Sequence, residues 1–198
     1  IIQGFSGVMS VTGSAEAAPL RVGYPVADSI GGLTAAFAIS AALVRRGRTG
    51  EGEFIDVSML ESVMVTMGWV VSNYLTAGVT PAPMGNENMT ASPSGTFRTG
   101  DGLLNIAANK QEQFVTLCRL LGREDLSCDS RFAEREARKR NRKALTVELE
   151  RALASRGAAD WERLLNRNGV PSGTPFGVRK VRGGPLSAAA ALDRAGTM

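Results

Sequence analysis

A long, Ala-rich apolar segment that starts near Asp28 and stops at Gly47 places the strongest constraint on the fold of this chain. Asp28 or Ser29 can cap its start, and two arginines, Arg45 and Arg46, precede Gly47, where cations favour a helix end. A face built mainly of Ala allows close approach, so we expect this helix to pack on a flat surface such as a β-sheet. Its apolar positions recur with helical spacing: Ile30, Leu33, Phe37, Ile39, Ala42 and Leu43.

The segments that follow this helix predict an α/β domain. A turn at 49–52 leads into residues 53–57, whose composition is typical of a short strand. Residues 58–75 then predict a second long helix that is apolar nearly all round and therefore buried or interfacial. A helix, a strand and a helix in this order fit the closing part of an α/β domain over residues 1–75.

The second half of the chain predicts a separate small α+β domain over residues 97–176. It is preceded by residues 76–96, where Pro and Gly are frequent, which indicates a linker or a functional loop. The last segment, 177–198, is atypical, and within it residues 186–192 predict a short helix. The elements expected in the small domain are a β-hairpin around Gly100-Asp-Gly, a helix opened by a capping box at Asn109 and closed at Gly122, and helices at 133–155 and 158–168.

The composition limits the chemistry that the chain can perform. It contains no histidine, which excludes Ser-His-Asp and Cys-His catalysis within this chain, together with the commonest zinc sites. Its two cysteines, Cys118 and Cys128, lack metal-ligand spacing, and Cys118 reads as a buried thiol among leucines. We therefore expect no metal, and we expect catalysis to depend on carboxylates, Lys, Tyr, Ser, Thr or backbone amides.

The net charge of +4 arises largely in one stretch, residues 131–143, which holds seven Arg or Lys against two Glu. Such a stretch can bind a polyanion, and a non-catalytic basic binding module is one alternative for the whole chain. Because the charges surround the predicted helix, a solvated helix face is favoured and nucleic acid is not an expected partner. No apolar run approaches the roughly 20 residues of a membrane span, so we expect a cytoplasmic protein. The N-terminus lacks signal-peptide features, and we expect the sequence to begin in the middle of a longer protein.

Asp28 is the best candidate for a catalytic residue. A carboxylate at a helix N-terminus faces unpaired N–H groups and the positive end of the helix dipole, which favour the negative charge that a nucleophile needs. The adjacent Gly31 and Gly32 remove bulky side chains from the first turns, so a ligand could approach closely there. The spacing alone favours an ordinary N-cap.

Several motifs, in order, resemble segments of the family III CoA-transferases, the CaiB–BaiF group. Gln3-Gly-Phe-Ser-Gly-Val-Met-Ser-Val-Thr-Gly is similar to one segment, and Pro25-Val-Ala-Asp-Ser-Ile-Gly-Gly-Leu to the segment that carries the family's nucleophilic Asp. The stretch from Ala41 to Leu60 resembles a third, with Glu53 where Gln is usual. Further matches in the family's order are Gly85-Asn, Phe97-Arg-Thr-Gly-Asp-Gly, Leu121-Gly-Arg and Asn168-Gly-Val-Pro-Ser-Gly, so that the resemblance covers residues 1 to about 175.

The resemblance implies that Asp28 is the nucleophile of an enzyme that moves CoA between an acyl-CoA and a carboxylic acid through a covalent aspartyl intermediate. It implies that residues 1–75 close a Rossmann-like large domain, and that Asn86 and Asn88 lie near the bound acyl group, although their stretch lacks the family's run of glycines and an ordinary turn is an equal alternative for both. Gly31 and Gly32 complete the set of candidate CoA-binding residues. Family members are interlocked homodimers of about twice this length, so this chain is expected to be a fragment, inactive without an N-terminal half that holds most CoA contacts. A 2-methylacyl-CoA racemase of the same superfamily is the alternative enzyme.

Overall fold

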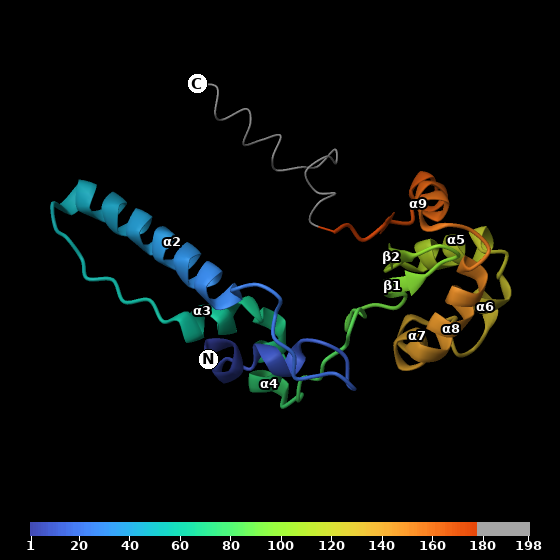
Figure 1. Cartoon of the computed structure of the whole chain (residues 1–198), viewed down its shortest axis with the longest axis horizontal. Coiled ribbons are helices and arrows are strands. Elements are labelled where there is room, and N and C mark those ends of the chain that lie inside the picture. Colours follow the sequence, from blue (N-terminus) through green and yellow to red (C-terminus); the bar gives the residue numbers. More distant parts are fainter. Residues whose placement is uncertain (178–198) are drawn as a thin grey trace, which may run out of the picture. The chain divides into compact units, whose positions relative to one another are not determined.

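The computed structural model describes residues 1–177, and the chain divides into two compact units, Ile1–Asn86 and Glu87–Met198 (Figure 1). The boundary between the units falls inside the segment 76–96 that the sequence marks as a linker or loop. The segment 178–198, with its predicted short helix, lies outside the described residues.

The first unit is built around one long helix, α2 (Val26–Thr49). It is preceded by a short helix, α1 (Ile2–Phe5), and by one 3₁₀ turn, Val8–Val11. The helix predicted from the Ala-rich segment is confirmed, but its ends differ. Pro25, not Asp28 or Ser29, occupies the N-cap position, and the helix passes Gly47 and ends at Gly50, whose φ of 76° only glycine adopts easily.

Two predictions for the rest of this unit are wrong. Residues 53–57 form no strand, because a strand needs a hydrogen-bonding neighbour and residues 1–86 contain no other strand with which they could pair. The helix predicted over 58–75 is divided into α3 (Met59–Thr66) and α4 (Gly68–Ala77), since Gly68 has a φ of 36° that interrupts a regular helix. Ser58 caps α3, and its hydroxyl accepts a hydrogen bond from the backbone N–H of Glu61 at 3.2 Å.

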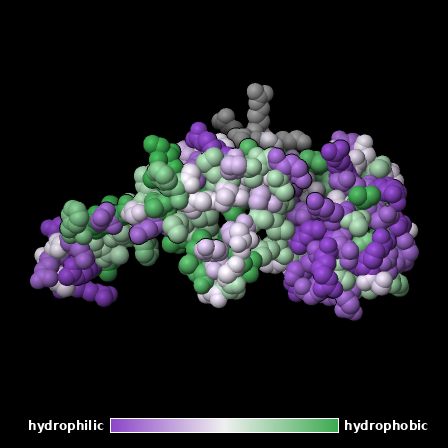
Figure 2. Space-filling view, turned by 90° about the horizontal axis from the view of Figure 1, so that it is seen from below, coloured by the Kyte–Doolittle hydropathy of each residue, from purple (hydrophilic) through white to green (hydrophobic). Residues whose placement is uncertain are grey.

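Much of the apolar surface of the first unit is exposed, so the helices of residues 58–77 are not fully buried within it, and their interfacial role stays a prediction. Phe37 on α2 is 77% exposed and Val65 on α3 is 78% exposed, and Figure 2 shows hydrophobic residues spread over this unit. By length and composition alone α2 could cross a membrane, with a mean hydropathy of 1.5, which was not expected because α2 contains no long uninterrupted apolar run. Ser, Thr and Gly interrupt its apolar run without lowering its mean hydropathy enough to prevent this, and a core helix of a soluble protein meets the same criterion.

The second unit contains the sheet. Strands β1 (Ser94–Arg98) and β2 (Leu103–Ala107) form the predicted hairpin, in a register that places Thr96 opposite Asn105. A two-residue strand, β3 (Ser172–Gly173), pairs antiparallel with β2 and completes the order β1-β2-β3. The mixed helix and sheet character of the chain is thereby confirmed, with the sheet confined to the small domain, while the Rossmann-like description of the first unit stays a prediction.

Within residues 87–177, five helices accompany this sheet: α5 (Gln111–Leu120), α6 (Asp125–Cys128), α7 (Arg135–Arg140), α8 (Arg142–Leu153) and α9 (Ala158–Arg167). The single helix predicted over 133–155 is divided at Asn141, whose φ and ψ are not helical. The capping box of α5 lies one residue later than predicted, because Lys110 is the N-cap and its N–H donates to Oε1 of Gln113 at 3.0 Å. One apolar core joins these helices to the sheet, and its large members include Phe114, Phe132, Leu149, Trp161 and Leu165.

The hairpin turn Gly100-Asp-Gly is fastened to the connection between α8 and α9. The N–H of Gly100 donates to the carbonyl of Arg156 at 2.9 Å, and Oδ1 of Asp101 accepts from the N–H of Ala158 at 2.7 Å. Asp101 therefore satisfies a free donor at the start of α9 from a distant point of the chain. Gly100 and Asp101, which belong to a motif that resembles the CoA-transferase family, thus have a structural role here.

Candidate active site

Asp28 lies in the first turn of α2, with its side chain exposed. Pro25, at the N-cap, has no N–H, and the N–H of Val26 turns back to the carbonyl of Tyr24 at 2.7 Å. The N–H of Ser29 donates to the carbonyl of Pro25 at 3.0 Å, but the N–H groups of Ala27 and Asp28 have no acceptor one turn earlier in the helix, so they form a local positive end next to the carboxylate. Within residues 1–177 no hydrogen bond or ion pair engages the Asp28 carboxylate, which leaves both of its oxygens accessible.

The two glycines after Asp28 have different surroundings. Gly31 is buried, and a Cβ added there would meet Cγ of Met59 at 3.2 Å, so this glycine allows α2 and α3 to pack closely. Gly32 is exposed, and a Cβ added there would meet nothing within 4 Å. The open surface that the sequence predicts beside Asp28 is therefore at Gly32, whereas Gly31 has a packing role.

Gln3 supports the start of α2, a role that the sequence did not reveal. Its side chain is 7% exposed, its Oε1 accepts from the N–H of Val22 at 2.9 Å, and its Nε2 donates to the carbonyl of Tyr24 at 3.3 Å. This amide thus fixes both sides of the segment that leads into Pro25. The signal was present, because Gln3 opens the first motif that resembles the family, but a motif letter does not say which backbone groups a side chain will bind.

Asn86 and Asn88, the other predicted site residues, fall on either side of the unit boundary. Asn86 is the last residue of the first unit, and its side chain is exposed. Asn88 belongs to the second unit, where its Oδ1 accepts from both the N–H and the hydroxyl of Thr90 at 2.8 Å, the geometry of an ordinary turn. Asp28, Gly31 and Gly32 lie together at the start of α2, whereas Asn88 belongs to the other unit.

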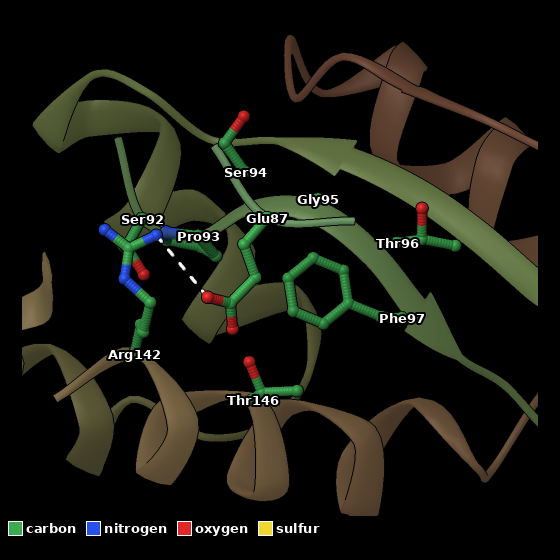
Figure 3. A pocket seen from close by; sticks show the side chains of 9 residues that line it. All are labelled: Glu87, Ser92, Pro93, Ser94, Gly95, Thr96, Phe97, Arg142 and Thr146. Carbon is green, nitrogen blue, oxygen red and sulfur yellow. Dashed lines mark ion pairs between the residues drawn. The ribbon is translucent and has the colours of Figure 1, made fainter. Parts of the chain in front are cut away.

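A small cavity lies in the second unit between the start of β1 and helix α8 (Figure 3). Its volume is about 50 Å³, and its wall includes an ion pair between Arg142 and Glu87, with an N–O distance of 3.6 Å. Ser92, Ser94, Thr96 and Thr146 also line it. A water occupies about 30 Å³ of liquid, so this space suits one or two waters and is too small for an acyl-CoA.

The side chains of the described residues whose pKa values are shifted owe these shifts to contacts that stabilise the fold. The pKa of the Glu148 carboxyl is lowered by hydrogen bonds from Arg123 and Arg151 and by the positive charge of both side chains. The pKa of Glu162 is lowered by a hydrogen bond from the Thr174 hydroxyl. Burial raises the pKa of the Cys118 thiol to about 12, which makes it inert at neutral pH. Within residues 1–177, no three His, Cys, Asp or Glu side chains gather closely enough to hold a metal ion.

Comparison with known proteins identifies the family. The family model described as CoA-transferase family III matches residues 1–191, nearly the whole chain. The chain belongs to CoA-transferase family III. The family membership predicted from the ordered motifs is therefore confirmed. The prediction that the chain belongs to an enzyme family, the CoA-transferases, is confirmed with it.

Relatives and solved structures agree with this assignment. The chain is 34% identical over 190 residues to the acetyl-CoA:oxalate CoA-transferase of Acetobacter aceti, covering 96% of the chain and 49% of that protein. It is 34% identical over 173 residues to the succinyl-CoA:glutarate CoA-transferase of Mus musculus, covering 87% of the chain and 40% of that protein. A crystal structure of a CaiB/BaiF family protein from Brucella suis superimposes with a TM-score of 0.83 at 36% identity, over 95% of this chain and 50% of that one.

The chain spans about half the length of the relatives that it matches. Half of each relative therefore has no counterpart in these 198 residues. This difference agrees with the expectation that the chain corresponds to the C-terminal part of a family member.

Proposed function

We propose that Asp28 is the nucleophile of a CoA-transferase that exchanges CoA between an acyl-CoA and a free carboxylic acid. The observation that carries the proposal is the exposed, unpaired carboxylate in the first turn of α2, within the motif that matches the family. The relatives, which are named for acetyl-CoA:oxalate and succinyl-CoA:glutarate transfer, support acyl-CoA and a carboxylic acid as the two substrates.

The proposed reaction proceeds through acyl transfers to and from Asp28. The carboxylate attacks the thioester carbonyl of the donor, the C–S bond breaks, and a mixed anhydride forms while CoA thiolate leaves. Attack of that thiolate on the aspartyl carbonyl expels the donor carboxylate and gives an aspartyl-CoA thioester. The acceptor carboxylate attacks this thioester and forms a second anhydride, and the thiolate then attacks the acceptor acyl carbon, which restores Asp28 and releases the new acyl-CoA.

The surroundings of Asp28 fit these steps. Negative charge develops on the carbonyl oxygen in each tetrahedral transition state, and the free N–H groups of the first turn of α2 are suitable donors for it. The open surface at Gly32 gives a thioester room to approach the carboxylate from the solvent side. Each attacking group is already an anion, so the sequence of steps needs no general base, which is consistent with a chain that has no histidine.

We further propose that activity requires the half of the family fold that lies outside these 198 residues, together with a second copy of the protein. The apolar side chains left exposed on α2, such as Leu33 and Phe37, support this proposal, because an enzyme must cover such a surface to stay soluble. The chain alone is then expected to be inactive, and turnover by it would contradict this part of the proposal. The relatives named above all transfer CoA, so no finding favours the racemase alternative.

Hydroxylamine trapping tests the assignment of Asp28. In the experiment, the chain is joined to the N-terminal half of the Brucella suis relative, and acyl-CoA and hydroxylamine are added. The account predicts that peptide mass spectrometry finds a hydroxamate on Asp28, and that Asp28→Ala abolishes both the label and turnover. Asp56→Ala is the matched control, because Asp56 is also exposed in the first unit. An active enzyme in which Asp28 is never labelled would refute the proposal.

A further inference from the structure

The side chain of Gln3 holds the segment that leads into α2 at two points. Its Oε1 accepts from the N–H of Val22 at 2.9 Å, and its Nε2 donates to the carbonyl of Tyr24 at 3.3 Å. A backbone N–H can only donate and a carbonyl can only accept, so these partners fix the orientation of the amide. The two bonds join positions 19 and 21 residues apart in the chain, and they tie α1 to the residues just before Pro25.

A side-chain amide is the group that these two partners require. A carboxylate could accept from Val22 but could not donate to the carbonyl of Tyr24, and a lysine could donate but not accept. Gln3 is buried, so its amide cannot exchange either backbone partner for water without exposing itself. The pairing therefore favours glutamine over an acid, a base or an apolar residue at this position.

The carbonyl of Tyr24 connects Gln3 to the first turn of α2. It accepts from the N–H of Val26 at 2.7 Å as well as from Gln3. Pro25, between these two residues, has neither an N–H nor a polar side chain, so the N-cap residue itself cannot hold the start of the helix with a hydrogen bond from its side chain. Val26 and Ala27 are buried and fix the first turn by packing, while Gln3 fixes the segment that enters it.

We propose that Gln3 is a positioning residue for Asp28: by holding Tyr24, it keeps the Asp28 carboxylate and the unpaired N–H groups of the first turn of α2 in the geometry that acyl transfer requires. The inference rests on the proposed function, since it assigns Gln3 to the reaction of Asp28. No hydrogen bond joins the Gln3 amide to Asp28 in the part of the chain that the structure describes, so Gln3 acts through the backbone. Because the same N–H groups serve each tetrahedral transition state, loss of Gln3 should slow transfer from the donor and transfer to the acceptor alike.

Amide hydrogen exchange of the 198-residue chain, followed by NMR, tests the hold on α2 without requiring activity. Two variants remove both hydrogen bonds: Gln3→Leu, and Gln3→Met, which keeps the length and unbranched shape of the side chain. In both, exchange at Val22 and Val26 should accelerate by about tenfold or more, while the second unit keeps its protection. Ser62→Ala is the matched control, because Ser62 is also 7% exposed and loses one hydrogen bond within α3, from its Oγ to the carbonyl of Ser58 at 2.8 Å. Unchanged exchange at residues 22–26 in both Gln3 variants would overturn the proposal.

Kinetics of the active, joined enzyme distinguish positioning from stability. A displaced catalytic group lowers the rate of the chemical step, so both Gln3 variants should lower kcat by about tenfold or more and leave KM for acyl-CoA and for the acceptor acid unchanged within about twofold. Hydroxylamine should label Asp28 more slowly in the same proportion, and Ser62→Ala should keep the kcat of the unmodified enzyme.

Two results would overturn the positioning role and leave Asp28 as the nucleophile. One is an unchanged kcat in variants whose exchange is accelerated, and the other is a loss of kcat in the Ser62→Ala control as large as that in the Gln3 variants. Failure to label Asp28 in the unmodified, active enzyme would instead refute the proposed function, whatever the Gln3 variants show.

Discussion

The substitution Gly100→Ala should destabilise the second unit markedly, although it adds a single methyl group. A Cβ at this position would lie 2.8 Å from the carbonyl oxygen of Ala154 and 3.0 Å from that of Arg156. Both are backbone atoms, so the hairpin turn would have to move and strain its 2.9 Å hydrogen bond to Arg156. Overpacking costs about 1–3 kcal/mol and a hydrogen bond about 1 kcal/mol, so we expect a loss of about 2–3 kcal/mol.

The same turn provides the matched control. A Cβ on Gly102 meets nothing within 4 Å, and neither glycine has a positive φ, so Gly102→Ala should be neutral or slightly stabilising. The assay is thermal unfolding followed by the fluorescence of Trp161 in a Trp69→Phe background, since the chain has two tryptophans. For a domain of this size about 1 kcal/mol corresponds to about 4–8 °C, so Tm should fall by at least about 8 °C. Equal Tm values for the two variants would refute the reasoning.

Three further perturbations have defined outcomes. Gln3→Leu should cost the first unit about 1 kcal/mol in urea unfolding followed by Trp69 fluorescence, because two partly buried backbone groups lose their partner, and an unchanged midpoint would count against this. The hydrogen bonds from Thr174 lower the pKa of Glu162, so they stabilise the fold fully above the ordinary pKa of 4.5 and progressively less as the pH falls below it. Thr174→Val should therefore weaken the dependence of Tm on pH in the acid range. A thiol reagent at pH 8 should label the exposed Cys128 and spare Cys118 until the protein unfolds; rapid labelling of both would contradict the structure.

Local sequence signals predicted the elements whose stability is local or lies within one unit. The hairpin at Gly100-Asp-Gly and the amphipathic helix α5 depend on turn residues and on apolar spacing, and both form close to where they were expected. The same signals did not predict helix boundaries that depend on the backbone dihedral angles of single residues. The φ of Gly68 divides one expected helix, and Asn141 divides another at a position with no Pro or Gly.

The strand expected at 53–57 failed for a different reason. A strand forms only with a neighbour, and the first unit provides none, so the pattern was present without its partner. The candidate site shows the same limit. Asp28 and Gly32 could be placed by helix spacing and by family motifs, whereas Gln3 acts through contacts with distant backbone groups, which no periodicity reveals.

The most direct test of covalent catalysis at Asp28 follows oxygen atoms. An acceptor acid labelled with oxygen-18 forms an anhydride with Asp28, and breakage of its acceptor acyl C–O bond leaves the bridging oxygen on the aspartate. In the next turnover that oxygen departs with the donor carboxylate. Mass spectrometry of the joined, active enzyme should therefore find label on the Asp28 peptide and in the released donor acid. Turnover that leaves both unlabelled would contradict the account.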